Sequence, residues 1–194
     1  MIVLGLDTTG SACACALVNN GNVLAQKSEM IGRGHAERLA PMVHQLLQEA
    51  RHKVSDIDQI AVCTGPGSFT GLRVALAFAK GLALPQKTPL IGLSALEVFA
   101  AQQDPLQNKD MTVFTDVKRG EVCLQRFNSG LAIGAAQTLK RDDADLCGAT
   151  EISGSISVPI MAWLSIGKHP DDFPAAPLYS RPPDAKLPGG LTPS

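Results

Sequence analysis

The chain has 194 residues, of which 45% are hydrophobic, 18% are charged and 4% are aromatic, and its formal net charge is −1. This length fits one large or two small globular domains with a real hydrophobic core. The near-neutral charge and the few aromatic residues argue against direct binding of single-stranded RNA by this chain alone, because such binding uses a basic groove and stacked rings.

The number and spacing of the cysteines and the length of the apolar runs indicate the cellular compartment of the chain. The five cysteines form no C-x-x-C pair, and their odd number and spacing favour a reducing compartment. Asp7 interrupts the first apolar run too early for the core of a signal peptide, and no apolar run has the length of a membrane span. We therefore expect a cytoplasmic protein that does not bind membranes.

Three short strands and a helix are expected first along the chain. The strands are predicted over Ile2–Leu6, Ser11–Val18 and Val23–Ser28. The tight turns between them, above all the Asn-Gly turn at Asn19–Asn22, predict an antiparallel meander. A helix over His35–Ala50 follows, in which Pro41 must either fall in the first turn or kink the helix.

Strands and helices alternate in the next part. The predicted elements are strand Gln59–Thr64, helix Ser68–Leu84, strand Leu90–Gly92 and helix Ala95–Gln102, for which Ser94 is the expected N-cap. The complete order β-β-β-α-β-α-β-α predicts an α/β fold of the ribonuclease-H-like type found in actin-like ATPases, with a mixed sheet flanked by helices.

The composition changes after Gln103, so we place the first lobe over residues 1–104. A hairpin of Met111–Asp116 and Glu121–Phe127, with a further strand over Leu131–Leu139, predicts a second, shortened lobe over residues 105–180. Eight of the thirteen prolines fall at or after Pro159. Residues 181–194 are therefore expected to form a Pro-rich tail.

Two turns carry residues that suit a nucleotide phosphate. Asp7-Thr8-Thr9-x-Ser11 follows the first strand, and Gly65-Pro66-Gly67-Ser68 precedes the second long helix, where free backbone N–H groups attract anions. The loop has neither the Gly-Lys-Ser/Thr of a Walker A loop nor the G-x-G-x-x-G spacing of a dinucleotide site. Both alternatives stay open for these residues: a phosphate cradle, or turns held by Asx-type hydrogen bonds.

Other catalytic patterns are weak. His35, His44 and His52 lack the i, i+4 spacing of a metal pair. Ser68 lies outside any G-x-S-x-G elbow. Neither a metal centre nor a serine hydrolase is expected.

Several motifs follow one another in a characteristic order. They are D-T-T-x-S, H-A-E-R-L-A-P from His35, G-P-G-S-F-T-G-L-R-V, A-K-G-L-A, and P-L-Y-S-R-P-P-D-A-K from Pro177. On these motifs the chain resembles the TsaB (YeaZ) family of bacterial tRNA threonylcarbamoyladenosine biosynthesis proteins. The resemblance is dense from Met1 to Phe127, and the region around residues 142–166 is short relative to typical members. It implies a two-lobed, Gcp-like fold of the actin-like (ASKHA) superfamily.

The resemblance also implies a role without catalysis. TsaB-like proteins pair with a metal-bearing paralogue, TsaD, which modifies adenosine 37 of ANN-decoding tRNAs, and an ATPase, TsaE, joins the complex. The resemblance implies no intrinsic cofactor and only indirect contact with tRNA, and it leaves ATP or ADP binding open. The paralogue binds its metal through the histidines of an N-H-L-E-G-H motif. The matching positions here are Ala95 and Phe99, which cannot ligate a metal, so a silent subunit is expected.

Contact with the partner is expected through the two long helices. The candidate residues are His35, Leu39, Val43, Leu46, Leu72, Arg73, Ala75, Leu76, Ala79 and Lys80. The small-residue stripe of the second helix admits a partner helix closely; the alternative is that it faces the chain's own sheet. In isolation a homodimer that reuses this surface is expected. The alternative function is an actin-like ATPase or phosphotransferase that uses the Asp7 turn and the Gly65–Ser68 loop.

Overall fold

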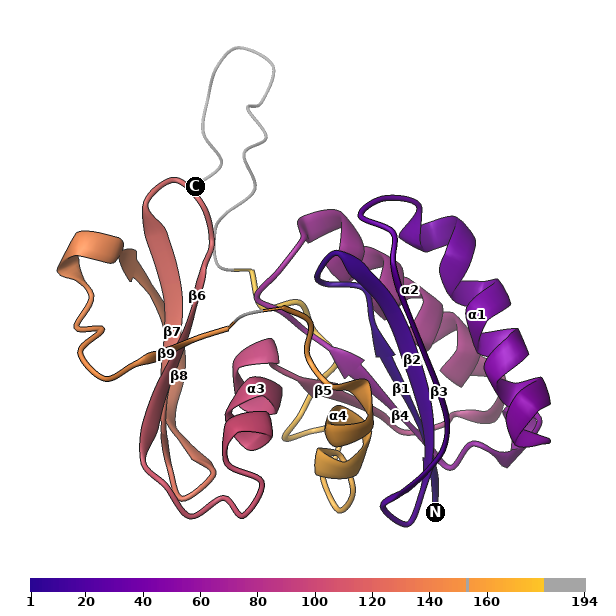
Figure 1. Ribbon diagram of the computed structural model, residues 1–194. Helices are drawn as coiled ribbons and strands as arrows, with labels where there is room; N and C mark the ends of the chain where they lie inside the picture. The colour runs from indigo at the N-terminus through magenta and orange to yellow at the C-terminus, as the bar shows by residue number, and fades with distance from the viewer. Residues whose placement is uncertain (153, 180–194) are drawn as a thin grey trace.

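The computed structural model describes residues 1–152 and 154–179, so the predicted tail over residues 181–194 lies outside the described residues. Its elements form four successive layers: two long helices, a five-stranded sheet, two shorter helices and a four-stranded sheet (Figure 1).

The five-stranded sheet has the order β3-β2-β1-β4-β5. Its strands are β1 (Ile2–Asp7), β2 (Ala12–Asn19), β3 (Asn22–Met30), β4 (Gln59–Cys63) and β5 (Leu90–Leu93). The first three form the predicted antiparallel meander, and β4 and β5 run parallel to β1. The carboxyl ends of β1, β4 and β5 therefore meet at one edge of the sheet, where ligands of open α/β sheets usually bind.

Helices cover both faces of this sheet. On one face lie α1 (His35–Ala50) and α2 (Phe69–Ala83); on the other lie α3 (Ala95–Gln103) and α4 (Val158–Leu164). Both long helices were predicted within a residue at each end. Pro41 lies beyond the first turn of α1 on its exposed face, and the helix continues through it to Ala50.

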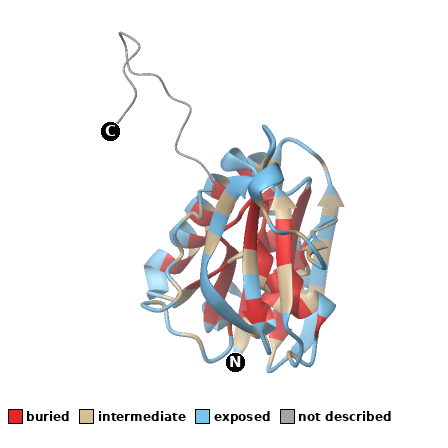
Figure 2. Ribbon diagram, turned by 90° about the vertical axis from the view of Figure 1, so that its left-hand side faces the viewer, coloured by how far each residue is buried: buried red, intermediate tan, exposed pale blue. Residues whose placement is uncertain are grey.

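The second sheet has the order β8-β7-β6-β9. Its strands are β6 (Met111–Asp116), β7 (Glu121–Asn128), β8 (Leu131–Lys140) and β9 (Thr150–Glu151), and 3-10 turns lie at Val54–Asp56, Leu84–Gln86 and Arg141–Asp143. β8 is exposed along most of its length, whereas half of the residues of β7 beside it are buried (Figure 2). Phe99 of α3 packs against this sheet while Val98 packs against the first. One short helix thus belongs to two cores.

The chain returns to the first sheet after β9, which differs from the predicted second lobe over residues 105–180. Val158 and Met161 of α4 are buried among side chains of β1, β2 and β4. Gly5 permits this contact, since a Cβ there would stand 2.7 Å from a Val158 methyl carbon. The second lobe is therefore confined to the residues between α3 and α4.

Candidate functional site

The turn after β1 is closed by its own hydrogen bonds. One carboxylate oxygen of Asp7 accepts the backbone N–H of Thr9 at 2.8 Å and the Thr9 hydroxyl at 2.7 Å. The Thr8 hydroxyl donates to the Gly71 carbonyl of α2 at 2.6 Å. Asp7, Thr8 and Thr9 are buried, whereas Ser11 is exposed. The segment is an Asx-type turn fixed to α2.

Burial also shifts the pKa of two side chains at this turn. It raises the pKa of the Asp7 carboxyl, although the hydrogen bonds from Thr9 act in the opposite direction. Burial raises the pKa of the Cys63 thiol as well, whose sulfur lies 3.6 Å from the Thr9 hydroxyl. With 2% of its surface exposed, Asp7 presents almost nothing to a hydrated metal ion or a phosphate.

The glycine loop packs directly onto the same turn. Ser68 donates its backbone N–H to the Thr9 carbonyl at 2.7 Å. A Cβ on Gly67 would stand 2.6 Å from the Thr9 carbonyl oxygen, and one on Gly71 would stand 1.9 Å from that of Thr8. Glycine is required at these positions because two backbone segments touch there.

Two backbone donors at the start of α2, the N–H groups of Ser68 and Gly71, are already engaged within the chain. The Ser68 side chain accepts the N–H of Gly71 at 3.2 Å, and the Ser68 carbonyl accepts the N–H of Leu72 at 2.8 Å. A phosphate that used these N–H groups would have to displace these bonds and the contact with Thr9. The structure therefore brings Asp7, Thr8, Thr9, Gly67 and Ser68 together as packed turns, whereas Ser11 lies apart at the surface.

The positions matched to the paralogue's metal ligands lie in the interior. Ala95 and Phe99 of α3 are 4% and 3% exposed and belong to the cores on the two sides of that helix. In the described part of the chain, no group of three or more His, Cys, Asp or Glu side chains is placed to hold a metal ion.

Most of the candidate partner residues are buried against the chain's own sheet. Those with buried side chains are Leu39, Val43, Leu46, Leu72, Ala75, Leu76 and Ala79. These side chains face the chain's own sheet, which was the alternative prediction for the stripe. The prediction that they form a partner surface is therefore corrected. Arg73 and Lys80 are exposed. His35 begins α1, and its Nε2 is buried with no hydrogen-bond partner in the structure as described.

Between α1 and α2 the outer surface forms an apolar groove of about 450 Å³. It is lined by Ala36, Leu39, Phe69, Thr70, Arg73, Val74, Ala77 and Phe78. The groove is an apolar surface feature shared by the two long helices. We refer to it as the α1–α2 groove.

An aromatic cluster stands at one end of this groove. The Arg73 guanidinium lies 3.8 Å from the centroid of the Phe69 ring, whose centroid is 5.2 Å from that of Tyr179. Phe69 is 42% exposed and Tyr179 is 41% exposed. Phe69 and Tyr179 were missed in the sequence. The available signal was a large aromatic residue directly after the Ser68 N-cap and off the buried stripe.

No helix in residues 1–152 and 154–179 combines the length and the hydropathy needed to cross a membrane.

Comparison with known proteins agrees with this architecture. Residues 22–146 match the family model described as TsaD, tRNA N6-adenosine threonylcarbamoyltransferase. The solved structure of YeaZ from Pseudomonas aeruginosa superposes with a TM-score of 0.75 at 28% identity, covering 92% of this chain and 99% of that one. The predicted ribonuclease-H-like (ASKHA) fold class is thereby confirmed.

Two curated relatives are similar in sequence. TsaB of Escherichia coli K12, a tRNA threonylcarbamoyladenosine biosynthesis protein, is 42% identical over 100 residues, which are 52% of this chain and 43% of that protein. An uncharacterized protein of Mycobacterium tuberculosis H37Rv is 32% identical over 201 residues, covering 95% of this chain and 93% of that protein. The matched region thus spans less than half the length of the Escherichia coli protein.

Proposed function

Since the chain belongs to the TsaB (YeaZ) family, we propose that it is a non-catalytic scaffold subunit in tRNA threonylcarbamoyladenosine biosynthesis. It binds and stabilises the metal-bearing transferase subunit, a TsaD paralogue, in the cytoplasm. The complex also includes a TsaE-type ATPase and acts on adenosine 37 of ANN-decoding tRNAs, which this chain contacts only indirectly.

The α1–α2 groove is the observation that carries this proposal. Exposed apolar surface bordered by an arginine and an aromatic ring is typical of the centre of protein interfaces. Phe69 and Arg73 are already held in place by their mutual contact, so little side-chain entropy is lost when a partner covers them. A helix of the paralogue fits such a groove between two helices.

The packed Asp7 turn supports the non-catalytic part of the proposal. A metal or nucleotide site needs side chains that face solvent or a cavity, whereas Asp7, Ala95 and Phe99 are all in the interior. Purified protein is therefore expected to hold no stoichiometric metal. Titration with Mg²⁺ and ATP or ADP is expected to give no turnover by the chain alone; micromolar affinity with turnover would instead establish the actin-like ATPase.

Co-expression with the TsaD paralogue of the same organism tests partner binding. Ala77 is exposed and lines the groove, so Ala77→Arg places a long cation where the partner helix would pack. We expect capture of the paralogue and the yield of modified tRNA to fall at least about tenfold, as for loss of an interface hot spot. Gln103→Arg adds the same charge at an exposed position of α3 and should capture the paralogue normally. Equal capture by both variants would refute the groove as the binding site.

The same surface is proposed to form a homodimer when the paralogue is absent. Sedimentation should give a concentration-dependent dimer for the natural chain and a monomer for Ala77→Arg. A natural chain that remains monomeric at high concentration would contradict this part of the proposal.

A further inference from the structure

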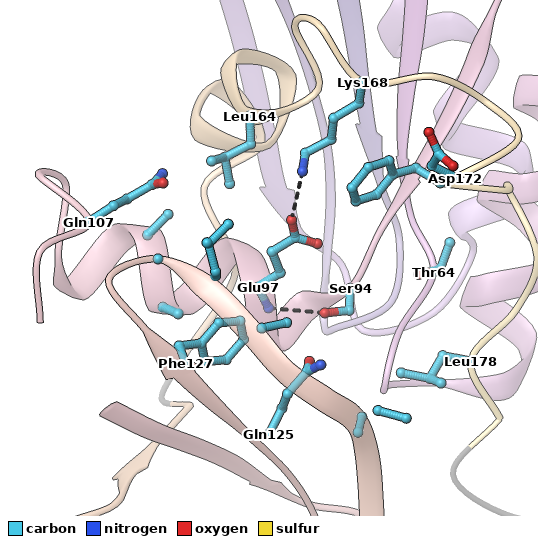
Figure 3. Close-up of a pocket in the computed structure, with 18 of the residues that line it drawn as sticks. Thr64, Ser94, Glu97, Gln107, Gln125, Phe127, Leu164, Lys168, Asp172 and Leu178 are labelled. Atoms are coloured by element: carbon cyan, nitrogen blue, oxygen red, sulfur yellow. Dashed lines mark hydrogen bonds and ion pairs between the residues drawn. The ribbon is translucent and has the colours of Figure 1, made fainter. Parts of the chain in front are cut away.

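A large cleft lies on the far side of the first sheet from the α1–α2 groove. Its volume is about 1350 Å³, and its walls are α3, the β7–β8 hairpin and the returning segment from Trp163 to Leu178. Thr64 and Ser94, which follow β4 and β5, are among its lining residues (Figure 3). The cleft thus opens at the carboxyl edge of the parallel strands, where ligand sites of α/β proteins collect.

An ion pair joins two walls of this cleft. The Nζ of Lys168, on the returning segment, lies 3.2 Å from Oε1 of Glu97 on α3, and each side chain is 22% exposed. Figure 3 shows the two side chains extending toward each other. The Ser94 hydroxyl oxygen accepts the backbone N–H of Glu97 at 3.0 Å, so the helix is capped without using the Glu97 carboxylate. The ammonium also lies 3.7 Å from the centroid of the Phe173 ring.

The walls around the pair are largely apolar and small. They include Ala100, Ala101, Phe127, Ala136, Leu164 and Phe173. A few convergent polar groups inside an apolar cleft are typical of a small-molecule site. The polar groups at the centre of this cleft are the opposite charges of Glu97 and Lys168, which together carry no net charge.

We propose that this cleft binds a small zwitterion of the α-amino acid class, with its ammonium on Glu97 and its carboxylate on Lys168. A ligand with a single charge would engage one member of the pair and leave the other partly buried without a partner, which is costly. A zwitterion satisfies both members through charge-assisted hydrogen bonds. The apolar walls then accept an uncharged side chain. This site is independent of the proposed scaffold role.

Trp163 supplies the readout, because it is the single tryptophan of the chain and lines the cleft while 47% exposed. The full chain is titrated with L-valine, L-leucine and L-threonine, and binding is followed by tryptophan fluorescence and calorimetry. We expect a saturable change for at least one of them. The matching N-acetyl amino acid lacks the cation and the amino acid amide lacks the anion, and each should bind about tenfold or more weakly, as expected for loss of a charged hydrogen bond.

Substitutions of Glu97 and Lys168 test whether these two charges bind the ligand. Glu97→Gln and Lys168→Met keep nearly the same volume, and each should abolish saturable binding. Asp143→Asn removes an exposed charge outside the cleft and should bind as the natural chain does. Thermal unfolding checks that each variant is folded; if one is not, the derivative series on the natural chain still decides. No saturable change up to about 10 mM, well above the usual range for small-ligand sites, or equal binding of the blocked derivatives, would overturn the proposal.

Discussion

At the scale of single residues, alanine substitutions of two glycines in α2 should have opposite effects on the free energy of unfolding. A Cβ on Gly71 would stand 1.9 Å from the Thr8 carbonyl oxygen, whereas one on Gly81 would meet nothing within 4 Å. Gly71→Ala should lower the free energy of unfolding by about 1–3 kcal/mol, because the turn after β1 must move away. Gly81→Ala should raise it by up to about 1 kcal/mol through helix propensity. Chemical denaturation measures both; equal effects would show that the Asp7 turn does not rest on α2.

The buried Asp7 carboxyl predicts a pH dependence of stability. Its pKa is raised by burial in the folded chain, so the folded state binds the proton more tightly than the unfolded state does. The contribution of Asp7 is therefore most favourable below its ordinary pKa and is lost as the pH rises through the folded-state pKa. Asp7→Asn keeps an oxygen for the bonds from Thr9 but carries no charge.

We expect Asp7→Asn to be at least as stable as the natural chain at pH 7, and the advantage to disappear on acidification. Denaturation at several pH values between about 3 and 8, a range that brackets carboxyl titration, measures the difference. Asp171→Asn, at an exposed position, should leave the natural pH profile unchanged. An advantage of Asp7→Asn that grows toward low pH would contradict the sign.

The candidate residues near Asp7 and Gly65 were predictable, but their role was not. D-T-T and G-P-G-S identify both turns in the sequence. The decisive facts are that the Thr9 carbonyl accepts the N–H of Ser68 and that the Thr8 hydroxyl reaches Gly71. These contacts join segments about sixty residues apart, and no local pattern distinguishes them from an open cradle.

At the scale of elements, α4 tests how much a short helix contributes to the stability of the fold. It has seven residues with Pro159 in its first turn, too few for a periodic signal, so it was missed in the sequence. Met161 is fully buried among side chains of the first sheet. Met161→Ala should cost about 2–5 kcal/mol, whereas the volume-conserving Met161→Leu should cost less than about 1.5 kcal/mol. Denaturant melts compare the two; similar small costs would mean that α4 packs loosely.

The two long helices show the complementary limit of sequence reasoning. The bounds of α1 and α2 and the buried face of each helix follow from 3.6-residue periodicity. It places Leu46 on the buried face of α1 and Ala79 on the buried face of α2. Periodicity does not say whether that face meets the chain's own sheet or a second protein. The structure buries it inside, and side chains on the flanks of the stripe, such as Phe69 and Ala77, line the α1–α2 groove that we propose as the partner site.

At the scale of the whole molecule, the α1–α2 groove and the cleft lie on opposite sides of the first sheet. α1 and α2 cover one face of this sheet, and α3 and α4 cover the other (Figure 1). The lining residues of the groove and of the cleft have no member in common. Substitutions at sites that share no contacting residues usually act additively. Partner binding and zwitterion binding should therefore be independent.

Two variants test this independence in both directions. Ala77→Arg should lose the paralogue while Trp163 still reports zwitterion binding with an unchanged midpoint. Glu97→Gln should lose the zwitterion while it still captures the paralogue. Allosteric coupling between two sites typically changes an affinity about 5- to 150-fold, so a shift of that size in either cross-experiment would show that the sheet transmits the state of one face to the other. The cleft would then act as a regulatory site for assembly. The coupling would pass through the returning segment, because Leu178 lines the cleft and the next residue, Tyr179, contacts Phe69 at the groove.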